Sequence, residues 1–436
     1  MEKQIAIIGL GYVGLPLALT YALEGFTVSG VDIDPGRIAA IRSCSLGMRE
    51  DFDGVPVNAV LKRCLGDGTL SVSDAFELVP KDVHTFIVTV GIPISRGWEL
   101  DLAMLRNACT QLGRLLREGD LVICRSTVPV GTTRGLVRET LERESGLAAG
   151  DGFDLAYSSE RIAEGSAYDE FRKMPLVVGG ITEHSRNRAV EVLGAVNREP
   201  VFEASSMELV EAAKMFENAQ RDVNVAVANQ LARFAHRFGI PTRELVRACN
   251  THTRVKILNP GIGVGGHCIP YASPYLFGSL PDAGEYQDLL PTFVSARQAN
   301  AGQPAYIAQR ISERLEGLEH RRLLVVGAGM KDFSDDITGS PALDLAGELT
   351  VRGAEVRVFD TVAALPGDVC AVENLESGVL WADGVILPIL QGGIDYAGLK
   401  HVLLERGRND PVILFDFRGV YEQQVDMVNA SWYVRL

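Results

Sequence analysis

The stretch from residue 4 to residue 32 constrains the fold more than any other part of the sequence. An apolar run, Gln4–Ile8, leads directly into the glycine pattern GLGYVG over 9–14. A helical pattern over 15–24 and a second apolar run, Thr27–Val31, come next. A strand, a glycine-rich turn, a helix and a parallel strand in about thirty residues make the βαβ unit of a dinucleotide-binding sheet. The chain is therefore predicted to begin with a doubly wound α/β domain.

The same segment predicts a cofactor. Glycines let the backbone approach a pyrophosphate, and the amino end of the following helix stabilises its charge. Asp32 comes 18 positions after Gly14, where a carboxylate accepts a hydrogen bond from a ribose 2′-hydroxyl and repels a 2′-phosphate. We predict NAD rather than NADP, with FAD third, and a glycine turn without ligand as the alternative. The residues assigned to the cofactor here are Gly9, Gly11, Tyr12, Val13, Gly14, Asp32 and Arg37.

Later apolar runs extend this first sheet. Strands are predicted at 85–90, 121–124, 154–157 and 175–180, and the domain is predicted to end near residue 200. Ligands bind at the carboxyl ends of such strands. The loop STVPVGTT (126–133), which follows one of them, is rich in hydroxyl groups. Two interpretations stay open for it: hydrogen bonds to the cofactor, or the N-cap of a helix predicted over 133–144.

A second α/β sheet is predicted in the last third of the chain. Its strands are expected at 321–326, 355–359, 384–388 and 412–415. The first of them ends in a Gly-Ala-Gly turn without a third glycine, which indicates a smaller nucleotide-binding domain without the dinucleotide pattern. Lys331 and Arg418 follow strands of this sheet and are placed to meet phosphates. The predicted fold class is α/β, with two Rossmann-like doubly wound domains joined by a long central helix.

That helix is the longest helical pattern in the chain and covers 206–238. Polar residues interrupt its Ala- and Val-rich turns, and two of them, Lys214 and Asn218, share one helical face. Such a helix is predicted to be buried between domains or subunits, where its polar groups are satisfied. A polar spine without chemistry is the alternative. The domains are predicted as 1–200, 201–300 and 301–436.

One cysteine follows a run of glycines. Four glycines in the six residues 261–266 come directly before His267 and Cys268. Because glycine permits positive φ and close backbone approach, this segment is predicted to be a tight loop that presents one thiol. A thiol among backbone N–H groups, or at the start of a helix, reacts as thiolate. The alternative is a buried structural cysteine.

Composition excludes several classes of protein. A net charge of −14 argues against broad nucleic-acid binding, which needs a basic face. The seven cysteines include no CxxC pair and no disulfide spacing, which suits a reducing compartment. The sequence leads directly into a strand, and no segment reaches the roughly 18 uninterrupted apolar residues of a membrane span. We expect a cytoplasmic protein with no nucleic-acid, membrane or metal partner.

Six ordered blocks resemble one family along almost the whole chain. They are GLGYVGLPLA (9–18), STVPVGTT (126–133), SERIAEG (159–165), AAKMFENAQRDVNVAVANQLA (212–232), GVGGHCIP (263–270) and DDITGSPALDL (335–345). Together they resemble the UDP-glucose/GDP-mannose dehydrogenase superfamily. The spellings SERIAEG and GGHCIP look most like the branch that oxidises UDP-N-acetylmannosamine or UDP-N-acetylglucosamine.

The resemblance implies an NAD-dependent four-electron oxidation of the sugar C6 hydroxyl to a uronate, through a thiohemiacetal and a thioester on Cys268. It implies that Lys214 and Asn218 stabilise oxyanions. Glu160 and Glu164 match the carboxylates that activate water and act as general base. Thr127 matches a threonine near the nicotinamide. The uronate is expected to serve the synthesis of surface polysaccharide precursors.

The resemblance also implies contacts with the UDP-sugar. The residues assigned to this substrate are Arg161, Arg254, Gly265, Lys331 and Arg418. Among them, Arg254 matches an arginine that reaches the substrate of a neighbouring subunit, which implies a homodimer or a higher homo-oligomer.

Two departures from the family pattern bear on the function. Ala272 stands where the family usually has an aspartate, and Thr338 stands where it has an arginine. They keep alternatives open: a UDP-glucose 6-dehydrogenase, or a nucleotide-sugar-binding homologue with impaired catalysis. A two-electron β-hydroxyacid dehydrogenase shares the first domain and the long helix, but it needs neither the cysteine nor a second nucleotide domain.

Overall fold

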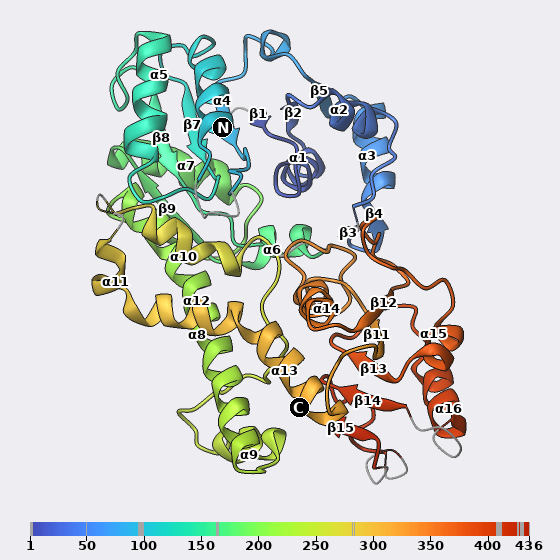
Figure 1. The fold of residues 1–436 in the computed structure, drawn as a ribbon. Helices are drawn as coiled ribbons and strands as arrows, with labels where there is room; N and C mark the ends of the chain where they lie inside the picture. The colour runs from blue at the N-terminus through green and yellow to red at the C-terminus, as the bar shows by residue number, and fades with distance from the viewer. Residues whose placement is uncertain are drawn as a thin grey trace. The chain divides into compact units, whose positions relative to one another are not determined.

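The computed structural model describes residues 3–48, 50–94, 100–162, 165–280, 282, 284–406, 412–424, 427 and 431–435 (Figure 1). The chain divides into two compact units. Unit 1 comprises Met1–Glu217 and Pro274–Ala283, and unit 2 comprises Asn218–Ser273 and Gly284–Leu436. The predicted division into functional parts at residues 200 and 300 stays a prediction.

Unit 1 is built on a sheet of eight strands within the described residues, in the order β10-β9-β8-β7-β6-β1-β2-β5. From β5 to β8 all neighbours pair in parallel, while β9 runs antiparallel to β8. The order reverses between β1 and β6, which is where ligands bind in sheets of this kind. The strands are β1 (Gln4–Ile8), β2 (Thr27–Val31), β5 (Leu70–Ser73), β6 (Thr85–Val88), β7 (Leu121–Cys124), β8 (Asp154–Tyr157), β9 (Leu176–Gly180) and β10 (Val201–Glu203).

Helices cover both faces of this sheet because alternate residues of its strands point to opposite sides. On one face Ile5 and Ile7 of β1 pack in a core with α1, and on the other Ala6 and Ile8 pack in a core with α4. The helices are α1 (Gly14–Leu23), α2 (Pro35–Arg42), α3 (Val57–Gly66), α4 (Ala103–Gly113), α5 (Arg138–Ser145), α6 (Ala167–Lys173) and α7 (Glu183–Gly194), with a short hairpin of β3 (Asp51–Phe52) and β4 (Val55–Pro56).

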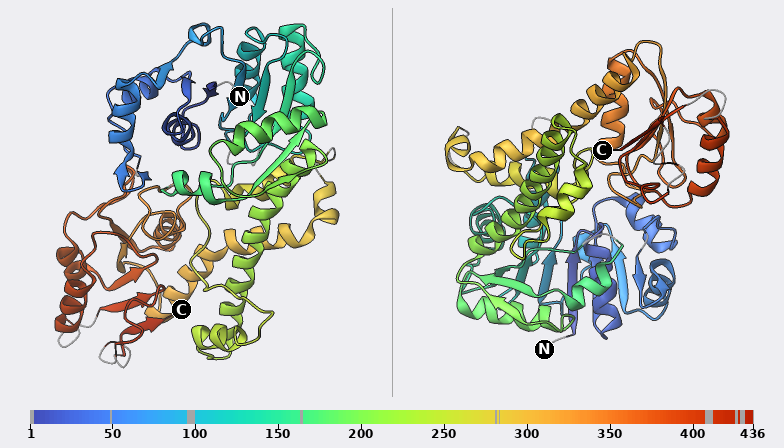
Figure 2. Two further views of the ribbon diagram at one scale, coloured as in Figure 1. Left: turned by 180° about the vertical axis from the view of Figure 1, so that it is seen from behind. Right: turned by 90° about the horizontal axis from the view of Figure 1, so that it is seen from below.

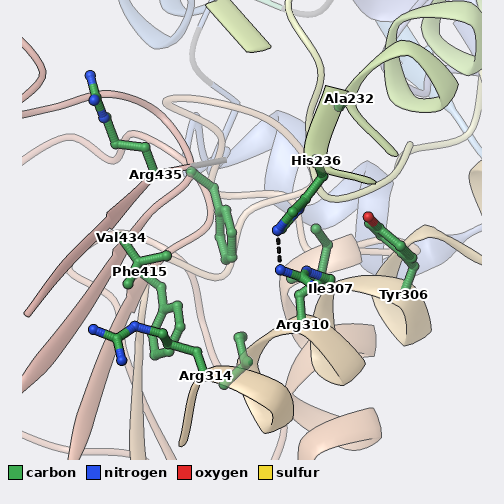
Figure 3. A pocket seen from close by; sticks show the side chains of 11 residues that line it. Ala232, His236, Tyr306, Ile307, Arg310, Arg314, Phe415, Val434 and Arg435 are labelled. Atoms are coloured by element: carbon green, nitrogen blue, oxygen red, sulfur yellow. Dashed lines mark hydrogen bonds between the residues drawn. The ribbon is translucent and has the colours of Figure 1, made fainter. Parts of the chain in front are cut away.

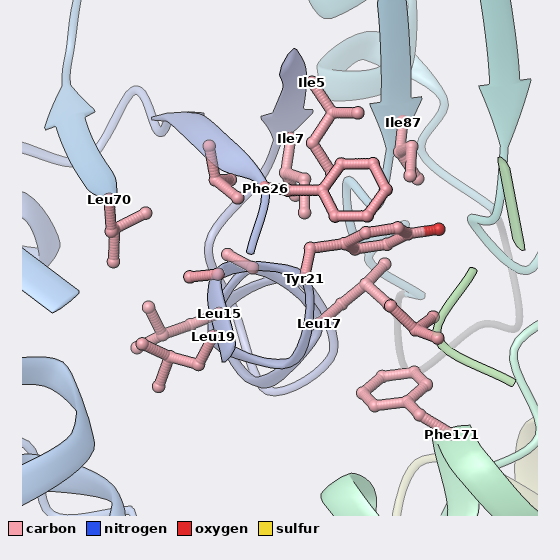
Figure 4. Close-up of a cluster of buried hydrophobic side chains, with 14 of the residues drawn as sticks. Ile5, Ile7, Leu15, Leu17, Leu19, Tyr21, Phe26, Leu70, Ile87 and Phe171 are labelled. Atoms are coloured by element: carbon pink, nitrogen blue, oxygen red, sulfur yellow. The ribbon is translucent and has the colours of Figure 1, made fainter. Parts of the chain in front are cut away.

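Helix α1 is apolar on nearly every side and is buried accordingly. Leu15, Leu17 and Leu19 are within 1% of full burial, and the fully buried Tyr21 packs against Phe26 (Figure 4). Each such side chain contributes about 1.5–3 kcal/mol of transfer free energy. This packing fixes the start of α1 at the glycine turn.

Unit 2 contains a fully parallel sheet in the order β12-β11-β13-β14-β15. The order reverses between β11 and β13, so the ends of these two strands mark the expected ligand site. Helices α13 and α14 cover one face, and α15 and α16 cover the other (Figures 1 and 2). The elements are β11 (Arg322–Val326), β12 (Glu355–Phe359), β13 (Gly384–Leu387), β14 (Ile413–Asp416), β15 (Tyr433–Arg435), α13 (Gln303–Leu315), α14 (Pro341–Val351), α15 (Leu375–Trp381) and α16 (Tyr396–Arg406).

A group of helices precedes this sheet in the sequence. The longest, α8, is one continuous helix from Met207 to Arg237 that supplies residues to both units. It is followed by α9 (Thr242–Cys249), α10 (Ile269–Phe277), α11 (Glu285–Leu289) and α12 (Pro291–Ala301). None of the described helices has the length and apolar character required to cross a bilayer.

The predicted fold class is confirmed, with two corrections of detail. Strands β5, β10 and β15 were not predicted, because their short sequences LSVS, VFE and YVR contain polar or charged residues and form no apolar run. The helix predicted over 133–144 begins with a π-helical turn, Thr133–Val137, and continues as α5.

Candidate active site

The glycine turn after β1 has the geometry that a pyrophosphate requires. Gly9 has φ +94°, and its N–H donates to Val31 O over 2.7 Å. A Cβ added at Gly14 would lie 1.8 Å from Gly9 O and 2.5 Å from Thr89 Oγ1, so only glycine allows α1 to begin against the turn. A Cβ at Gly11 would meet nothing within 4 Å. The turn therefore leaves open space at its middle glycine, where a ligand backbone can approach.

Asp32 lies at the end of β2 beside this turn. Its Oδ2 accepts from Leu10 N over 2.7 Å, and its Oδ1 accepts from Asp34 N over 3.0 Å. Each carboxylate oxygen can accept a further hydrogen bond, so the group retains capacity for a ribose hydroxyl. Arg37 extends over the exposed ring of Tyr12, with 5.9 Å between the guanidinium carbon and the ring centroid. The residues predicted for NAD thus come together around one turn.

The hydroxyl-rich loop after β7 is held by a residue that sequence reasoning missed. Glu211 of α8 is fully buried, and its carboxylate accepts from Gly131 N over 2.6 Å and from Thr133 N over 2.9 Å. Burial raises the pKa of Glu211, and the hydrogen bonds from Thr133 and Gly131 oppose that rise. The start of the helical segment is thus capped by a distant carboxylate rather than by a hydroxyl of its own loop. The only sequence signal was an acid one turn before Lys214.

The same loop keeps hydroxyl groups for a ligand. Thr127 is half-buried in it. Within the described part of the chain, the buried Ser126 Oγ has no hydrogen-bond partner. Buried hydroxyls are normally satisfied, so an orphan at the end of a central strand fits a bound cofactor. Of the two interpretations of the loop, hydrogen bonding to a ligand therefore fits this geometry.

Glu160 is a buried and fixed carboxylate, not a surface residue. Its Oε2 accepts from Arg125 Nη2 over 2.6 Å, and its Oε1 accepts from the N–H groups of Arg161 and Ile162 over 2.7 and 3.0 Å. The Arg161 guanidinium pairs in turn with Glu217, at 2.8 Å between Nη2 and Oε1. Sequence reasoning missed Arg125, because its partner Glu160 lies 35 positions away along the chain. Glu164 lies outside the described residues.

Lys214 and Asn218 are both buried on one face of α8. Their spacing of four residues places the ammonium and the amide one turn apart. Buried polar groups of this kind require partners or a ligand. Their side chains can stabilise negative charge that develops at a common substrate atom.

Cys268 is exposed and unpaired at the junction between the glycine loop and α10. The alternative of a buried structural cysteine is therefore wrong. The loop packs against the segment 330–341: Gly266 N donates to Thr338 O over 2.9 Å. A Cβ added at Gly265 would lie 2.8 Å from Gly339 O, so this glycine is required for the close approach.

The segment that contacts the cysteine loop also follows β11, at the reversal point of the second sheet. Lys331 is exposed in it. Arg418 follows β14, and its guanidinium pairs with Asp332. Two cationic side chains thus follow strand ends of this sheet, as predicted for a phosphate-bearing ligand. Arg254 is exposed in the loop after α9.

A separate pocket in unit 2 contains none of the predicted site residues among its described lining (Figure 3). It lies between the end of α8, α13 and the last two strands. The Arg310 guanidinium there interacts with both His236 and Glu313. Burial and the nearby Arg310 lower the pKa of His236. Arg310 and His236 are therefore engaged with neighbours, and the pocket is not part of the candidate site.

Comparison with known proteins agrees with this geometry. Residues 3–196 match the NAD-binding domain model of the UDP-glucose/GDP-mannose dehydrogenase family, and residues 208–301 match its central domain model. The chain is 34% identical to a UDP-N-acetyl-D-mannosamine dehydrogenase of Pyrococcus horikoshii, over 96% of this chain and 99% of that one. It is 32% identical to a UDP-N-acetyl-D-glucosamine 6-dehydrogenase of Pseudomonas aeruginosa, over 82% and 83%. A solved structure of UDP-D-ManNAc dehydrogenase from P. horikoshii superposes with a TM-score of 0.84 at 31% identity, covering 95% of this chain and 94% of that one.

Proposed function

The chain belongs to the UDP-glucose/GDP-mannose dehydrogenase family, and from this premise we propose that it oxidises C6 of a UDP-N-acetylhexosamine to the carboxylate. The observation that carries the proposal is the exposed thiol of Cys268 at the end of a glycine loop that contacts the segment 330–341 of unit 2, where we propose that the nucleotide binds. Such a placement brings a nucleophile to a sugar whose diphosphate is bound nearby. UDP-ManNAc and UDP-GlcNAc are the substrates we propose.

NAD, when bound at the turn after β1, would supply the hydride acceptor, with a fresh NAD molecule for each of the two oxidation steps. The first step turns the C6 alcohol into an aldehyde, and its hydroxyl proton leaves to a general base. Cys268 Sγ then adds to the aldehyde carbon and forms a thiohemiacetal. Loss of the second hydride gives a thioester, which water hydrolyses to the carboxylate and the free thiol.

Several side chains have proposed roles in these steps. Lys214 and Asn218 donate to the oxygen that becomes negative during addition and hydrolysis. Glu160, fixed by Arg125, and Glu164 act on the proton of the alcohol and on the attacking water. Arg161, Arg254, Gly265, Lys331 and Arg418 are proposed to contact the UDP-sugar.

Ala272 bears on the rate of hydrolysis. It lies one turn after Cys268 in α10 and is buried, so it supplies no carboxylate beside the thiol. We infer that the glutamates of unit 1 activate the water alone, and that thioester hydrolysis limits turnover.

A homodimer is part of the proposal. On α8, Val227 and Phe234 are 49% and 60% exposed, and Phe238 just after its end is 66% exposed. Their spacing of seven and four residues places them on one stripe of the helix. An apolar stripe of this length is typical of a helix that packs against a second copy. The unpaired cysteines suit a cytoplasmic location, and the uronate product suits surface polysaccharide synthesis.

The test is the number of NADH molecules formed for each sugar consumed, with UDP-ManNAc, UDP-GlcNAc, UDP-GalNAc and UDP-glucose each supplied with excess NAD. We expect two NADH per sugar from one N-acetyl substrate. Cys268→Ser should abolish steady-state turnover, while Cys370→Ser, which changes another exposed thiol of unit 2, should leave it intact. No NADH from any of these sugars, in protein that still binds NAD and UDP, would overturn the proposal in favour of a different substrate or of a binding homologue.

A further inference from the structure

We propose that Asn229 and Gln303 are positioning residues that fix the loop bearing Cys268. The inference rests on the proposed function, because it assumes that Cys268 is the nucleophile. Asn229 lies in α8 and Gln303 is the first residue of α13. Neither touches the thiol; both act through the peptide groups of Gly261.

The two side chains bind both polar groups of Gly261. Gly261 N donates to Asn229 Oδ1 over 3.0 Å, and Gly261 O accepts from Gln303 Nε2 over 3.0 Å. Both side chains are fully buried. A loop peptide whose donor and acceptor are both bound to fixed, buried amides has lost most of its freedom to rotate.

A buried network fixes Asn229 itself. Its Nδ2 donates to Asn300 Oδ1 over 3.0 Å, and Asn300 Nδ2 donates to Asp222 Oδ1 over 2.8 Å. Arg297 Nη1 donates to the same Asp222 oxygen over 3.0 Å. Burial raises the pKa of Asp222, and Arg297 opposes that rise. This chain of contacts leaves Asn229 one orientation, with its oxygen toward the loop.

Gln303 is oriented separately. Its Oε1 accepts from Arg233 Nε over 3.0 Å and from Arg233 Nη2 over 2.8 Å. The guanidinium therefore binds the oxygen of the amide and leaves the NH₂ group to the loop. The two anchors are thus set independently, one by the network of Asn300, Asp222 and Arg297 and one by Arg233.

The loop between Gly261 and Cys268 is short, and it is also held near Cys268. Ile262 inserts into the core of unit 2, and Gly266 N donates to Thr338 O over 2.9 Å. Cys268 follows two residues later and is exposed. A thiol that must intercept an aldehyde before it diffuses away requires a fixed position, because small misplacements reduce near-attack geometry steeply. The network supplies that position without contacting the substrate.

Gln303→Glu isolates the anchor. The carboxylate keeps its interaction with Arg233 but cannot donate to Gly261 O. Asn229→Ala removes the other anchor and serves where the first variant does not fold. Asn224→Ala is the matched control, since Asn224 is an exposed amide of the same helix.

Three measurements test the proposal. First, kcat should fall at least 10-fold in both variants, while the KM values for sugar and NAD stay within twofold. Second, with hydrazine present as an aldehyde trap, the NADH formed per sugar should fall from two toward one, because uncaptured aldehyde escapes. Third, the amides of residues 261–266 should exchange hydrogen at least 10-fold faster. The control should behave like the wild type in all three.

A role confined to stability would lower Tm yet leave the NADH ratio at two, and that result overturns the proposal. Unchanged exchange of residues 261–266 in folded variants also overturns it. A wild type that forms no NADH refutes the proposed function instead, and the exchange measurement then decides the anchoring alone.

Discussion

The two sheets begin with the same turn and use it differently. In both units the first glycine after the first strand has positive φ, +94° at Gly9 and +100° at Gly327. In both, the next backbone N–H donates over 2.7 Å to an aspartate that ends the neighbouring strand, Asp32 or Asp360. Because both sheets make these contacts, the turn is a feature of the pair of parallel strands and is not specific to one ligand.

The two aspartates differ in how much hydrogen-bonding capacity their carboxylates retain for a ligand. Asp32 accepts two backbone hydrogen bonds from the described residues. Asp360 accepts from Val362 N and Ala363 N over 2.8 Å each and from Gln391 Nε2 over 2.9 Å, in addition to the turn. One carboxylate keeps capacity for a ribose, whereas the other is consumed by its own loop.

The two turns also lead to different elements. After Gly9 a helix begins within five residues, so its amino end faces the turn. After Gly327 a loop runs to Ser340 before α14 begins, and this loop provides the carbonyl that binds Gly266. The first turn therefore leads to a helix start that can hold a dinucleotide. The second turn leads instead to a loop that contacts the segment bearing the proposed nucleophile.

The largest effect should come from Gly14→Ala. Its Cβ would lie 1.8 Å from Gly9 O, a backbone atom, so we expect a loss of about 3 kcal/mol or more and a Tm lower by about 6–12 °C. NAD affinity should fall more than 100-fold. Gly11→Ala is the control that separates the two effects, because its Cβ meets open space: thermal melting should be unchanged and only NAD titration should weaken.

Substitutions of the two aspartates should have smaller effects, one mainly on NAD affinity and the other mainly on stability. Asp32→Asn should weaken NAD by about 10-fold, or 1.4 kcal/mol, and improve NADP relative to NAD, because the repulsive charge is lost. Asp360→Asn should cost about 1–3 kcal/mol of stability, since buried N–H groups lose an acceptor, and should leave NAD binding within twofold. Isothermal titration and urea unfolding measure both. Equal loss of NAD affinity in the two variants would contradict the comparison.

The smallest effect should come from Thr338→Ala. The Thr338 backbone carbonyl, not its side chain, accepts from Gly266, so kcat should stay within twofold and stability within about 0.5 kcal/mol. A fall in kcat beyond 10-fold would show that the hydroxyl itself contacts substrate.

The sequence predicted those features that depend on residues close together along the chain. The strand at 121–124 and the glycine turn at 9–14 followed from an apolar run and from residue spacing, because a strand buried in a parallel sheet must be apolar.

The missed residues share one physical property. Glu211 meets Gly131 across 80 positions, Arg125 meets Glu160 across 35, and Asn229 meets Gly261 across 32. Such partners are adjacent only after the sheet and α8 have formed. Single-sequence spacing therefore predicts the elements but not the groups that orient the site.

Unit 1 is assembled from two separated stretches, and this has a consequence for its biosynthesis. Ser279 of the returning stretch accepts from Val130 N over 2.8 Å, and Tyr275 donates to Ile92 O over 3.3 Å. The ribosome adds about 5–20 residues per second, so these partners emerge several seconds after residue 217. During that interval the nascent first sheet lacks the contacts that Ser279 and Tyr275 later make with the loops after β7 and β6.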